Sequence, residues 1–431
     1  MIDATVDSAR RARSPVVAAA VSVWALLFGL LLLMLGNGLQ GTLIGVRATV
    51  EGFGTNATGL VMAGYFAGFL AGSSLAPRFI RRVGHLRVFA ALAALASVAI
   101  LVQSVFISPV PWGAMRVVIG FSFAGIYVAT ESWLNDRVTN EHRGGLLSIY
   151  MVISYAGLGG GQLLLNAAEP SGFVLFVLVS MLISLASVPI LLTVTAEPRS
   201  QAHQAVGVRT LHRLAPLGTT GCLAAGVATG ALLGMGPVYA TRIGMSVAEV
   251  SVFMAVLIGA GALVQWPIGK LSDRVDRHRV ILATAVVGAG GAAIAWAVQD
   301  VSLFAVIASG ALMGAAMLTL YSLSAAHMND SLSPFQMVGA SSRLVMIYGA
   351  GAVVAPPLAG WSMGLFGPGG FLALLLLALA GLAAHALVRE RREGRARART
   401  PYVNMPGRTP SLSPAWVEVV RTVEPEGGEP E

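Results

Sequence analysis

Two charged residues interrupt an apolar stretch that is long enough to cross a bilayer. Residues 111–136 read PWGAMRVVIGFSFAGIYVATESWLND and contain Arg116 and Glu131. A charged side chain in hydrocarbon is costly, so such residues normally face a protein interior or a water-filled cavity. At about 100° per residue, Arg116, Tyr127 and Glu131 share one face of a helix. The two charges lie ~22 Å apart along that helix, so each needs a partner elsewhere, and this face predicts a polar path.

Glu131 has two interpretations. A low dielectric penalises the charged form of a carboxyl group, so movement between wet and dry surroundings would change its proton affinity. Glu131 is therefore our candidate for a proton carrier or a solute contact. The structural alternative is an ion pair with Arg143 or Arg343 near the end of the helix. Arg116 likewise either contacts a solute or is a packing residue bonded to carbonyl groups of the first helix.

Polar side chains in other apolar segments are further candidates. Asn37 and Gln40 lie in the first segment, and Tyr155 and Gln162 lie about 20° apart on the helical wheel of a later one. Each pair either lines the polar path or hydrogen-bonds to a neighbouring helix. The glycines at 159–161 are interpreted as packing residues.

The stretch around Glu131 has a counterpart later in the chain. Residues 310–330 read GALMGAAMLTLYSLSAAHMND, in which Tyr321 stands 194 residues after Tyr127. The same offset, within a residue or two, aligns several other pairs: Gly41 with Gly236, Arg47 with Arg242, Leu75 with Leu271, Arg78 with Arg274, Gly120 with Gly314, and Tyr155 with Tyr348. An offset held across several segments indicates an internal duplication.

The duplication does not include the charges. Gly310 stands at the position that matches Arg116, and Ala325 stands at the position that matches Glu131. The charged chemistry is therefore expected in the first half. Tyr321 is the candidate contact from the second half.

The composition is that of a helical membrane protein. Apolar residues make up 56% of the chain and charged residues 11%, against about 25% charged in soluble domains. The pattern predicts an all-α polytopic membrane protein with twelve transmembrane helices. We expect them at residues 16–46, 56–78, 88–108, 111–134, 145–167, 171–194, 214–241, 247–268, 279–299, 302–325, 338–363 and 368–388.

The charge pattern divides and orients the chain. A polar connection separates two pseudo-symmetric six-helix halves, which gives a cytoplasmic N-terminus at 1–15, a first bundle at 16–194, a linker at 195–213, a second bundle at 214–388 and a disordered tail at 389–431. The net charge is +8, and the basic residues cluster in short loops and in the tail. Basic residues favour the cytoplasmic side, so both termini are expected there, with little beyond Arg47 and Arg242 outside. These charges are orientation signals rather than a nucleic-acid site.

Residues 265–280, QWPIGKLSDRVDRHRV, join two predicted helices through a short charged loop. The loop resembles the signature of the major facilitator superfamily, G-x-L-a-D-R-x-G-R-R, and departs from it at the second glycine. The resemblance implies a gating latch that includes Gly269, Asp273 and Arg274. We expect Asp273 to pair with Arg143 across the two halves.

Other motifs support this resemblance. Arg116 and Gly120 match the helix-4 Arg–Gly motif of the superfamily, which is tied to proton coupling. The chain is also similar to the YcaD-like group of bacterial transporters in Glu131-Ser132, in the run RGGLLSIYMVISYAGLGGGQLLL at 143–165 and in QWPIG at 265–269. The resemblance covers residues 16–388 and implies the major facilitator fold, with helices 1, 4, 7 and 10 around a central cavity.

The implied function is secondary active transport. The expected protein moves a small organic solute across a bacterial inner membrane by alternating access, coupled to protons, as a monomer without a cofactor. A receptor of the same fold and a multidrug efflux antiporter remain alternatives, although no proline follows the helix-5 glycines as it does in drug antiporters.

Lys270 is followed by Leu271 rather than Ser or Thr, so the sequence lacks a P-loop. No enzyme motif is evident, and the scattered histidines and single Cys222 predict no metal site. Membrane lipids are expected partners, and the substrate stays open.

Overall fold

The computed structural model describes residues 24–136, 140–192 and 207–392, and these residues are almost entirely helical. The first half contains α3 (Trp24–Val50), α4 (Thr55–Val83), α5 (His85–Val105), α6 (Pro109–Asp136), α7 (Asn140–Leu163), the short 3-10 helix η1 (Leu164–Ala167) and α8 (Val174–Leu191). The second half contains α10 (Pro216–Arg242), α11 (Val247–Arg274), α12 (Arg277–Val298), α13 (Leu303–Asn329), α14 (Pro334–Phe366) and α15 (Gly369–Arg392). The helix α9 (Val208–Leu214) precedes the second half.

Twelve of these helices are long and apolar enough to cross a membrane. The twelve predicted spans are therefore confirmed, with most boundaries shifted by a few residues. Residues 16–23 of the first predicted span lie outside the described residues, and its helix is described from Trp24 onward. The predicted N-terminus at 1–15 and nearly all of the tail lie outside the described residues.

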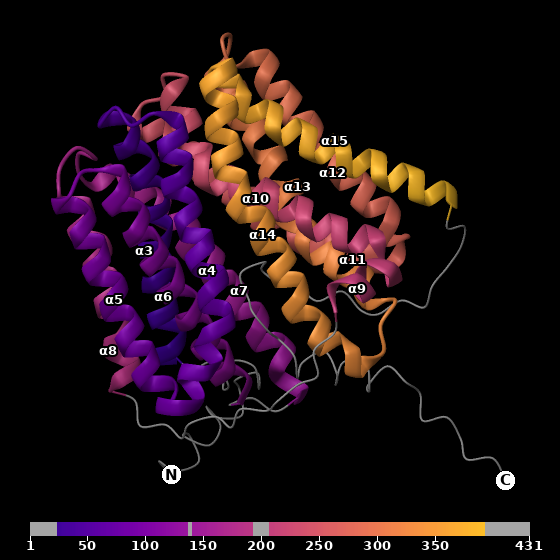
Figure 1. Ribbon diagram of the computed structural model, residues 1–431, viewed down its shortest axis with the longest axis horizontal. Helices are drawn as coiled ribbons and strands as arrows, with labels where there is room; N and C mark the ends of the chain where they lie inside the picture. Colours follow the sequence, from indigo (N-terminus) through magenta and orange to yellow (C-terminus); the bar gives the residue numbers. More distant parts are fainter. Residues whose placement is uncertain (1–23, 137–139, 193–206, 393–431) are drawn as a thin grey trace, which may run out of the picture.

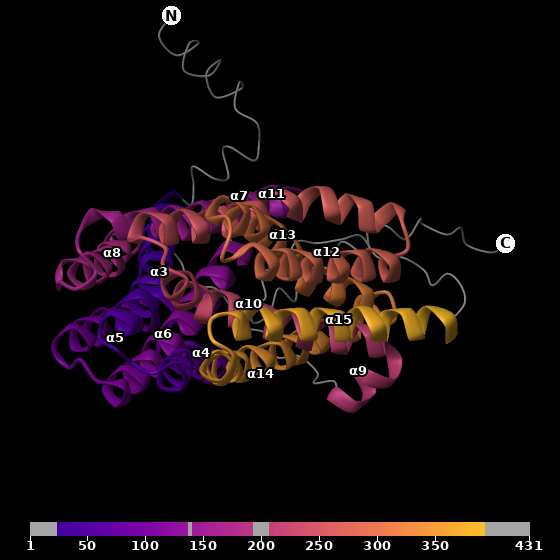
Figure 2. The same ribbon diagram turned by 90° about the horizontal axis from the view of Figure 1, so that it is seen from above.

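The first six and last six spans form two bundles that lie side by side (Figures 1 and 2). The short α9 falls inside the expected linker, and its His212 ring lies 2.8 Å from the Thr219 hydroxyl of α10. This contact ties the linker helix to the first turn of the second bundle. Successive spans run in opposite directions, so each bundle has two ends.

We call one end of the molecule the basic end. It holds the turn between α4 and α5 and the turn between α11 and α12, and the basic residues in and beside these two turns are Arg78, Arg81, Arg82, Arg87, Lys270, Arg274, Arg277 and Arg279. The other end, the opposite end, holds Arg47 and Arg242 in the last turns of α3 and α10. The asymmetry follows the charge pattern of the sequence.

Glycines bring helices of one bundle into backbone contact. A Cβ on Gly120 of α6 would lie 1.9 Å from the Tyr65 carbonyl oxygen of α4, and one on Gly68 would lie 2.0 Å from the Val117 oxygen of α6. In the second bundle, a Cβ on Gly314 would lie 2.0 Å from the Leu257 oxygen. Small residues allow such approach where lipid gives no hydrophobic driving force between helices. The duplicated glycines thus perform the same packing role in both bundles.

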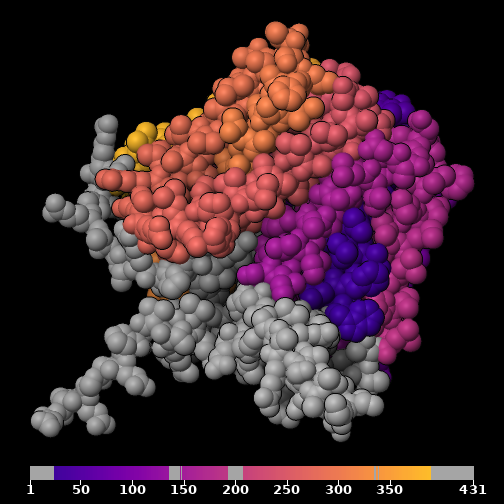
Figure 3. All heavy atoms as spheres, turned by 180° about the vertical axis from the view of Figure 1, so that it is seen from behind, coloured from indigo at the N-terminus to yellow at the C-terminus, as the bar shows by residue number. Residues whose placement is uncertain are grey.

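The bundles meet through α3 against α10, α4 against α14, and α7 against α11. Figure 3 shows the second bundle lying against the magenta surface of the first. At the opposite end, a Cβ on Gly360 of α14 would lie 2.3 Å from the Thr55 oxygen of α4. At the same end, the Asn166 amide donates to the Ser251 hydroxyl of α11 at 2.8 Å. The bundles are therefore in tight contact at the opposite end.

Candidate functional site

Glu131 lies buried near the junction of α6 and α7. Its side chain is 3% exposed, and the Tyr150 hydroxyl of α7 donates to Glu131 Oε1 at 2.9 Å. Glu131 forms no ion pair with a described residue. Arg343, one of its two expected partners, places a guanidinium nitrogen 3.4 Å from the Met346 sulfur on its own helix. The side chain of the other, Arg143, lies outside the described residues.

A phenol is a versatile partner for a carboxyl group. A tyrosine hydroxyl donates to an ionised carboxylate and can accept from a protonated one. The pair of Tyr150 and Glu131 can therefore stay hydrogen-bonded in both protonation states. An arginine in the same place would hold the carboxylate in its charged form. This arrangement suits a group that gains and loses a proton.

A tyrosine pair of the second bundle includes a neighbour of this carboxyl group. Tyr321 of α13 lies close enough to Glu131 to interact with it electrostatically. Its ring packs edge-on against Tyr348 of α14, with centroids 5.1 Å apart at 65°. These two residues match Tyr127 and Tyr155 in the internal duplication.

A second polar group joins three helices of the first bundle. The Asn37 amide of α3 donates to the Tyr127 hydroxyl of α6 at 3.1 Å, and the Tyr65 hydroxyl of α4 lies 3.4 Å from Asn37 Oδ1. The buried Arg116 guanidinium lies over the Tyr65 ring, with Cζ 4.6 Å from the centroid. Cation–π contact of this kind stabilises a charge away from water. Arg116, Tyr127 and Asn37 are thus brought together, and Glu131 follows one turn beyond Tyr127.

The remaining candidates of the first bundle differ from one another. Gln40 is fully buried, and neither amide atom has a hydrogen-bond partner among the described residues. Gln162 bonds instead to α3, because it accepts from the Thr42 hydroxyl and donates to the Gly38 oxygen at 3.0 Å. Tyr155 is half-buried and packs against the core. Gln40 therefore keeps unused hydrogen-bonding capacity, whereas Gln162 joins two helices.

Tyr65 and Tyr150 are site residues that the sequence pattern did not indicate. Both hydroxyls lie within apolar spans and contact candidates that it did name. The signal that could have found them was their residue type, because the chain has only 8 tyrosines and a phenol in lipid needs a polar partner. Among the described residues, no cluster of histidine, cysteine or acidic side chains could hold a metal ion.

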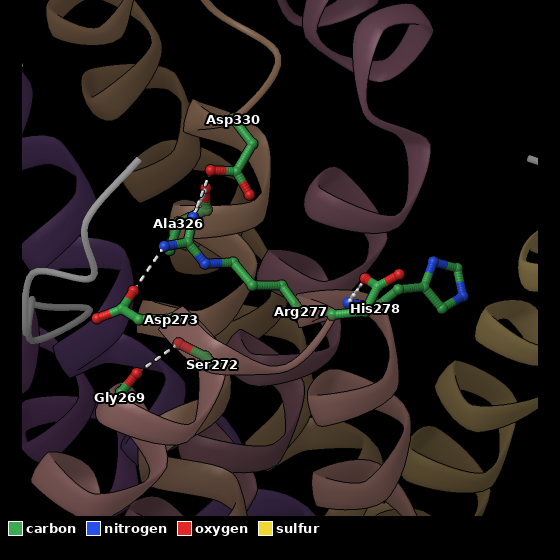
Figure 4. Close-up of polar contacts among 8 residues, drawn as sticks. Gly269, Ser272, Asp273, Arg277, His278, Ala326 and Asp330 are labelled. Atoms are coloured by element: carbon green, nitrogen blue, oxygen red, sulfur yellow. Dashed lines mark hydrogen bonds and ion pairs between the residues drawn. The ribbon is translucent and has the colours of Figure 1, made fainter. Parts of the chain in front are cut away.

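The charged loop forms an ion-pair cluster at the basic end (Figure 4). Arg277 of α12, buried to 2% exposure, donates to Asp273 Oδ1 at 2.9 Å and to the Ala326 carbonyl oxygen at 3.2 Å. It also pairs with Asp330 at the end of α13. Arg277 rather than Arg274, which is exposed, is the centre of this cluster.

The predicted latch residue Gly269 lies beside the cluster. The buried Gly269 accepts a hydrogen bond from the Ser272 hydroxyl at 2.8 Å, which closes the last turns of α11. One partner of Asp273 is Arg277, which lies in the same bundle. The expected partner from the other bundle, Arg143, has no described side chain.

Comparison with known families gives one match that covers most of the chain. The sequence profile of the Major Facilitator Superfamily matches residues 26–297 and 220–423. Among curated proteins, the chain is 32% identical over 338 residues to "Uncharacterized MFS-type transporter YcaD" of Escherichia coli O7:K1 (strain IAI39 / ExPEC), which covers 78% of this chain and 87% of the relative. The protein of that name from strain S88 (O45:K1) is 31% identical over the same shares.

Solved structures show the same fold at low identity. A mutant of the nucleoside transporter NupG superimposes with a TM-score of 0.75 at 13% identity, over 85% of this chain and 98% of the other. A bacterial homologue of the human lysosomal transporter Spinster, in an inward-facing and unoccupied conformation, gives a TM-score of 0.66 at 16% identity, over 95% and 98%.

Proposed function

The chain belongs to the Major Facilitator Superfamily and is a membrane transporter, and from this premise we propose that it moves a small organic solute by alternating access, driven by a proton gradient. Glu131 is the proton-responsive residue of this proposal. Both termini and the linker between the bundles face the cytoplasm. Reporter fusions at residues 200 and 400 test that orientation, and a periplasmic signal from either would contradict it.

The observation that carries the proposal is the environment of Glu131. The carboxyl group is buried, is hydrogen-bonded by a phenol and has no ion pair with a described residue. An acid inside a membrane span has a high energetic cost, so its presence there indicates a functional residue. Tyr321 of the second bundle lies within electrostatic range of Glu131, which supports a role at the boundary of the bundles.

Motion of the bundles supplies the coupling. When they separate at the basic end, water reaches the polar residues between them, and when they close there, water is excluded. Low dielectric disfavours the carboxylate, so proton binding and closure favour each other. By linkage, a protonated Glu131 shifts the equilibrium between the two states of the transporter.

The solute is proposed to bind beside this acid. Gln40 provides an amide donor and acceptor that have no partner among the described residues, and the rings of Tyr321 and Tyr348 provide an aromatic surface. The Asn37–Tyr127 hydrogen bond joins α3 and α6 between Gln40 and Glu131. The combination suits a small solute that has both polar groups and an apolar face.

The first experiment identifies a solute. A thermal-shift screen of the purified protein against metabolites and drugs finds compounds that raise the melting temperature, because binding stabilises the folded state. Uptake of a hit into proteoliposomes is then measured with and without an imposed pH gradient. Binding without uptake would indicate a receptor.

The second experiment tests the acid. Glu131→Gln keeps the shape of the side chain but removes its proton exchange. It should abolish accumulation driven by the pH gradient and leave solute binding in place. Continued accumulation by the variant would show that Glu131 is structural.

A further inference from the structure

A pocket of about 230 Å³ lies within the first bundle at its opposite end. It is formed where α3 and α5 end and α6 and α8 begin, and its lining residues are Arg47, Gln103, Ser104, Ile107, Trp112, Ser171, Gly172, Phe173 and Phe176. A dry cavity of about 150 Å³ already holds a benzene ring, so this pocket is large enough for a molecular group of several more atoms. It is separate from the residues around Glu131, which lie toward the basic end.

Two buried polar residues of the pocket have unused hydrogen-bonding atoms. Arg47 donates to the Pro170 carbonyl oxygen at 2.9 Å and pairs with Glu51 at 2.6 Å, while its Nε has no partner among the described residues. Gln103 donates to the Trp112 carbonyl oxygen at 3.3 Å, and its Oε1 is likewise unpaired within the described chain. The pocket residues thus offer one cationic donor and one neutral acceptor.

The pocket borders the part of the molecule that faces lipid. Figure 2 shows α5 and α8 on the side of the first bundle that is farthest from the second. Ile107 and Phe173, which line the pocket, are both exposed, as are Val105 and Phe106 beside them. In a bilayer, exposed apolar side chains of this kind are covered by acyl chains. A lipid there would have its tail on this rim and its headgroup at the pocket.

We propose that this pocket binds the headgroup of a zwitterionic phospholipid, with phosphatidylethanolamine as the best fit. The guanidinium of Arg47 donates to the phosphate, and Gln103 Oε1 accepts from the ammonium group. Since Glu51 already balances the charge of Arg47, the site is close to neutral and favours a zwitterion over an anionic lipid. All the lining residues belong to one bundle, so the site persists while the bundles move.

Native mass spectrometry of the purified full-length protein tests this proposal. Matched samples receive phosphatidylethanolamine, phosphatidylglycerol or inorganic phosphate, and the bound fraction is measured. We expect phosphatidylethanolamine to bind best. Phosphate alone should bind weakly because it lacks the ammonium group and the acyl chains. Equal retention of both lipids, or binding of phosphate to the same extent, would overturn the zwitterion assignment.

Three variants locate the lipid. Arg47→Lys keeps the charge but removes the Nε donor, and it should weaken phosphatidylethanolamine binding about tenfold, as expected for one lost hydrogen bond to a charged group. Ser104→Phe fills the pocket from its half-buried rim and should have the same effect without changing either buried polar residue. Arg242→Lys alters the exposed, duplicated position of the second bundle and should change nothing. Unchanged binding in Arg47→Lys and Ser104→Phe would show that the lipid sits elsewhere.

Discussion

The buried carboxyl group of Glu131 is hydrogen-bonded by a phenol of the next helix. The Tyr150 hydroxyl is the observed hydrogen-bond donor to Glu131, and hydrogen bonds to charged groups are worth about 1.5–3 kcal/mol. Tyr150→Phe removes this hydroxyl and leaves the ring in place. We expect the initial rate of proton-driven uptake to fall about tenfold, because the charged state of the carboxyl group loses its donor.

Tyr239→Phe is the matched control for that change. Tyr239 is also buried in a span, but its hydroxyl faces Gln299 of the second bundle at 3.5 Å. Its removal should leave the proton-driven rate within twofold of the wild type, as roughly expected for a weak, neutral hydrogen bond. Equal rates for Tyr150→Phe and wild type would mean that Glu131 works without its phenol.

The charged residues of the site were predictable, and their partners were not. Arg116 and Glu131 stand out because a charge in an apolar stretch is rare and costly. The Tyr65 ring under Arg116 and the hydroxyl at Glu131 depend on which helices are neighbours. Gln162 shows the same difficulty, because an amide looks identical in sequence whether it binds a solute or, as here, bonds to α3.

At the scale of the helices, Gly120 tests the packing of α4 against α6. An added Cβ would lie 1.9 Å from the Tyr65 carbonyl oxygen, so Gly120→Ala must push the two helices apart. Overpacking typically costs about 1–3 kcal/mol and occasionally more. We expect a clearly lower melting temperature for the purified protein. Gly113→Ala on the same helix, where a Cβ meets nothing within 4 Å, is the control and should melt like the wild type.

The two acids of the ion-pair cluster at the basic end are expected to have different roles, Asp330 in stability and Asp273 in gating. Asp330 is 8% exposed and Asp273 is 39% exposed, yet both pair with the buried Arg277. Loss of a buried partner costs about 3–5 kcal/mol, while an exposed pair is worth ~0–1 kcal/mol. Asp330→Asn should therefore lower the melting temperature and the yield.

Asp273→Asn should show the other behaviour. We expect near-normal expression and melting, because an exposed ion pair contributes little to stability. We expect slower transport, because the resemblance of this loop to the superfamily signature implies that Asp273 acts in gating. Expression is compared by quantitative immunoblotting, and transport by initial uptake rates. A normal transport rate in Asp273→Asn would show that this member of the cluster is dispensable for gating.

At the scale of the whole molecule, much of the fold could be predicted from the apolar spans and the internal duplication. Twelve spans and the 194-residue offset were readable because lipid demands long apolar helices and because matched glycines recur. Gly120 and Gly314 indeed make equivalent backbone contacts. The residue pattern does not predict that α3 packs against α10, α4 against α14 and α7 against α11. Close helix approach depends on small residues, and these occur throughout this chain, including its 51 glycines.

The contact between the bundles at the opposite end gives the last prediction. Asn166 of the first bundle donates to Ser251 of the second at 2.8 Å, so alternating access requires these residues to separate. The double variant Asn166→Cys/Ser251→Cys can be joined by oxidation or by a short bifunctional thiol reagent. The native Cys222 is fully buried and should not interfere.

Joining these two positions should stop transport, and a reductant should restore it after oxidation, because the bundles can no longer part at that end. Ser97→Cys/Ser180→Cys is the matched control, since these hydroxyls lie 2.7 Å apart on α5 and α8 of one bundle. That link leaves the movement of one bundle against the other free, so transport should continue. Unimpaired transport by the fully joined Asn166–Ser251 variant would show that the opposite end stays closed throughout the cycle, which is incompatible with alternating access.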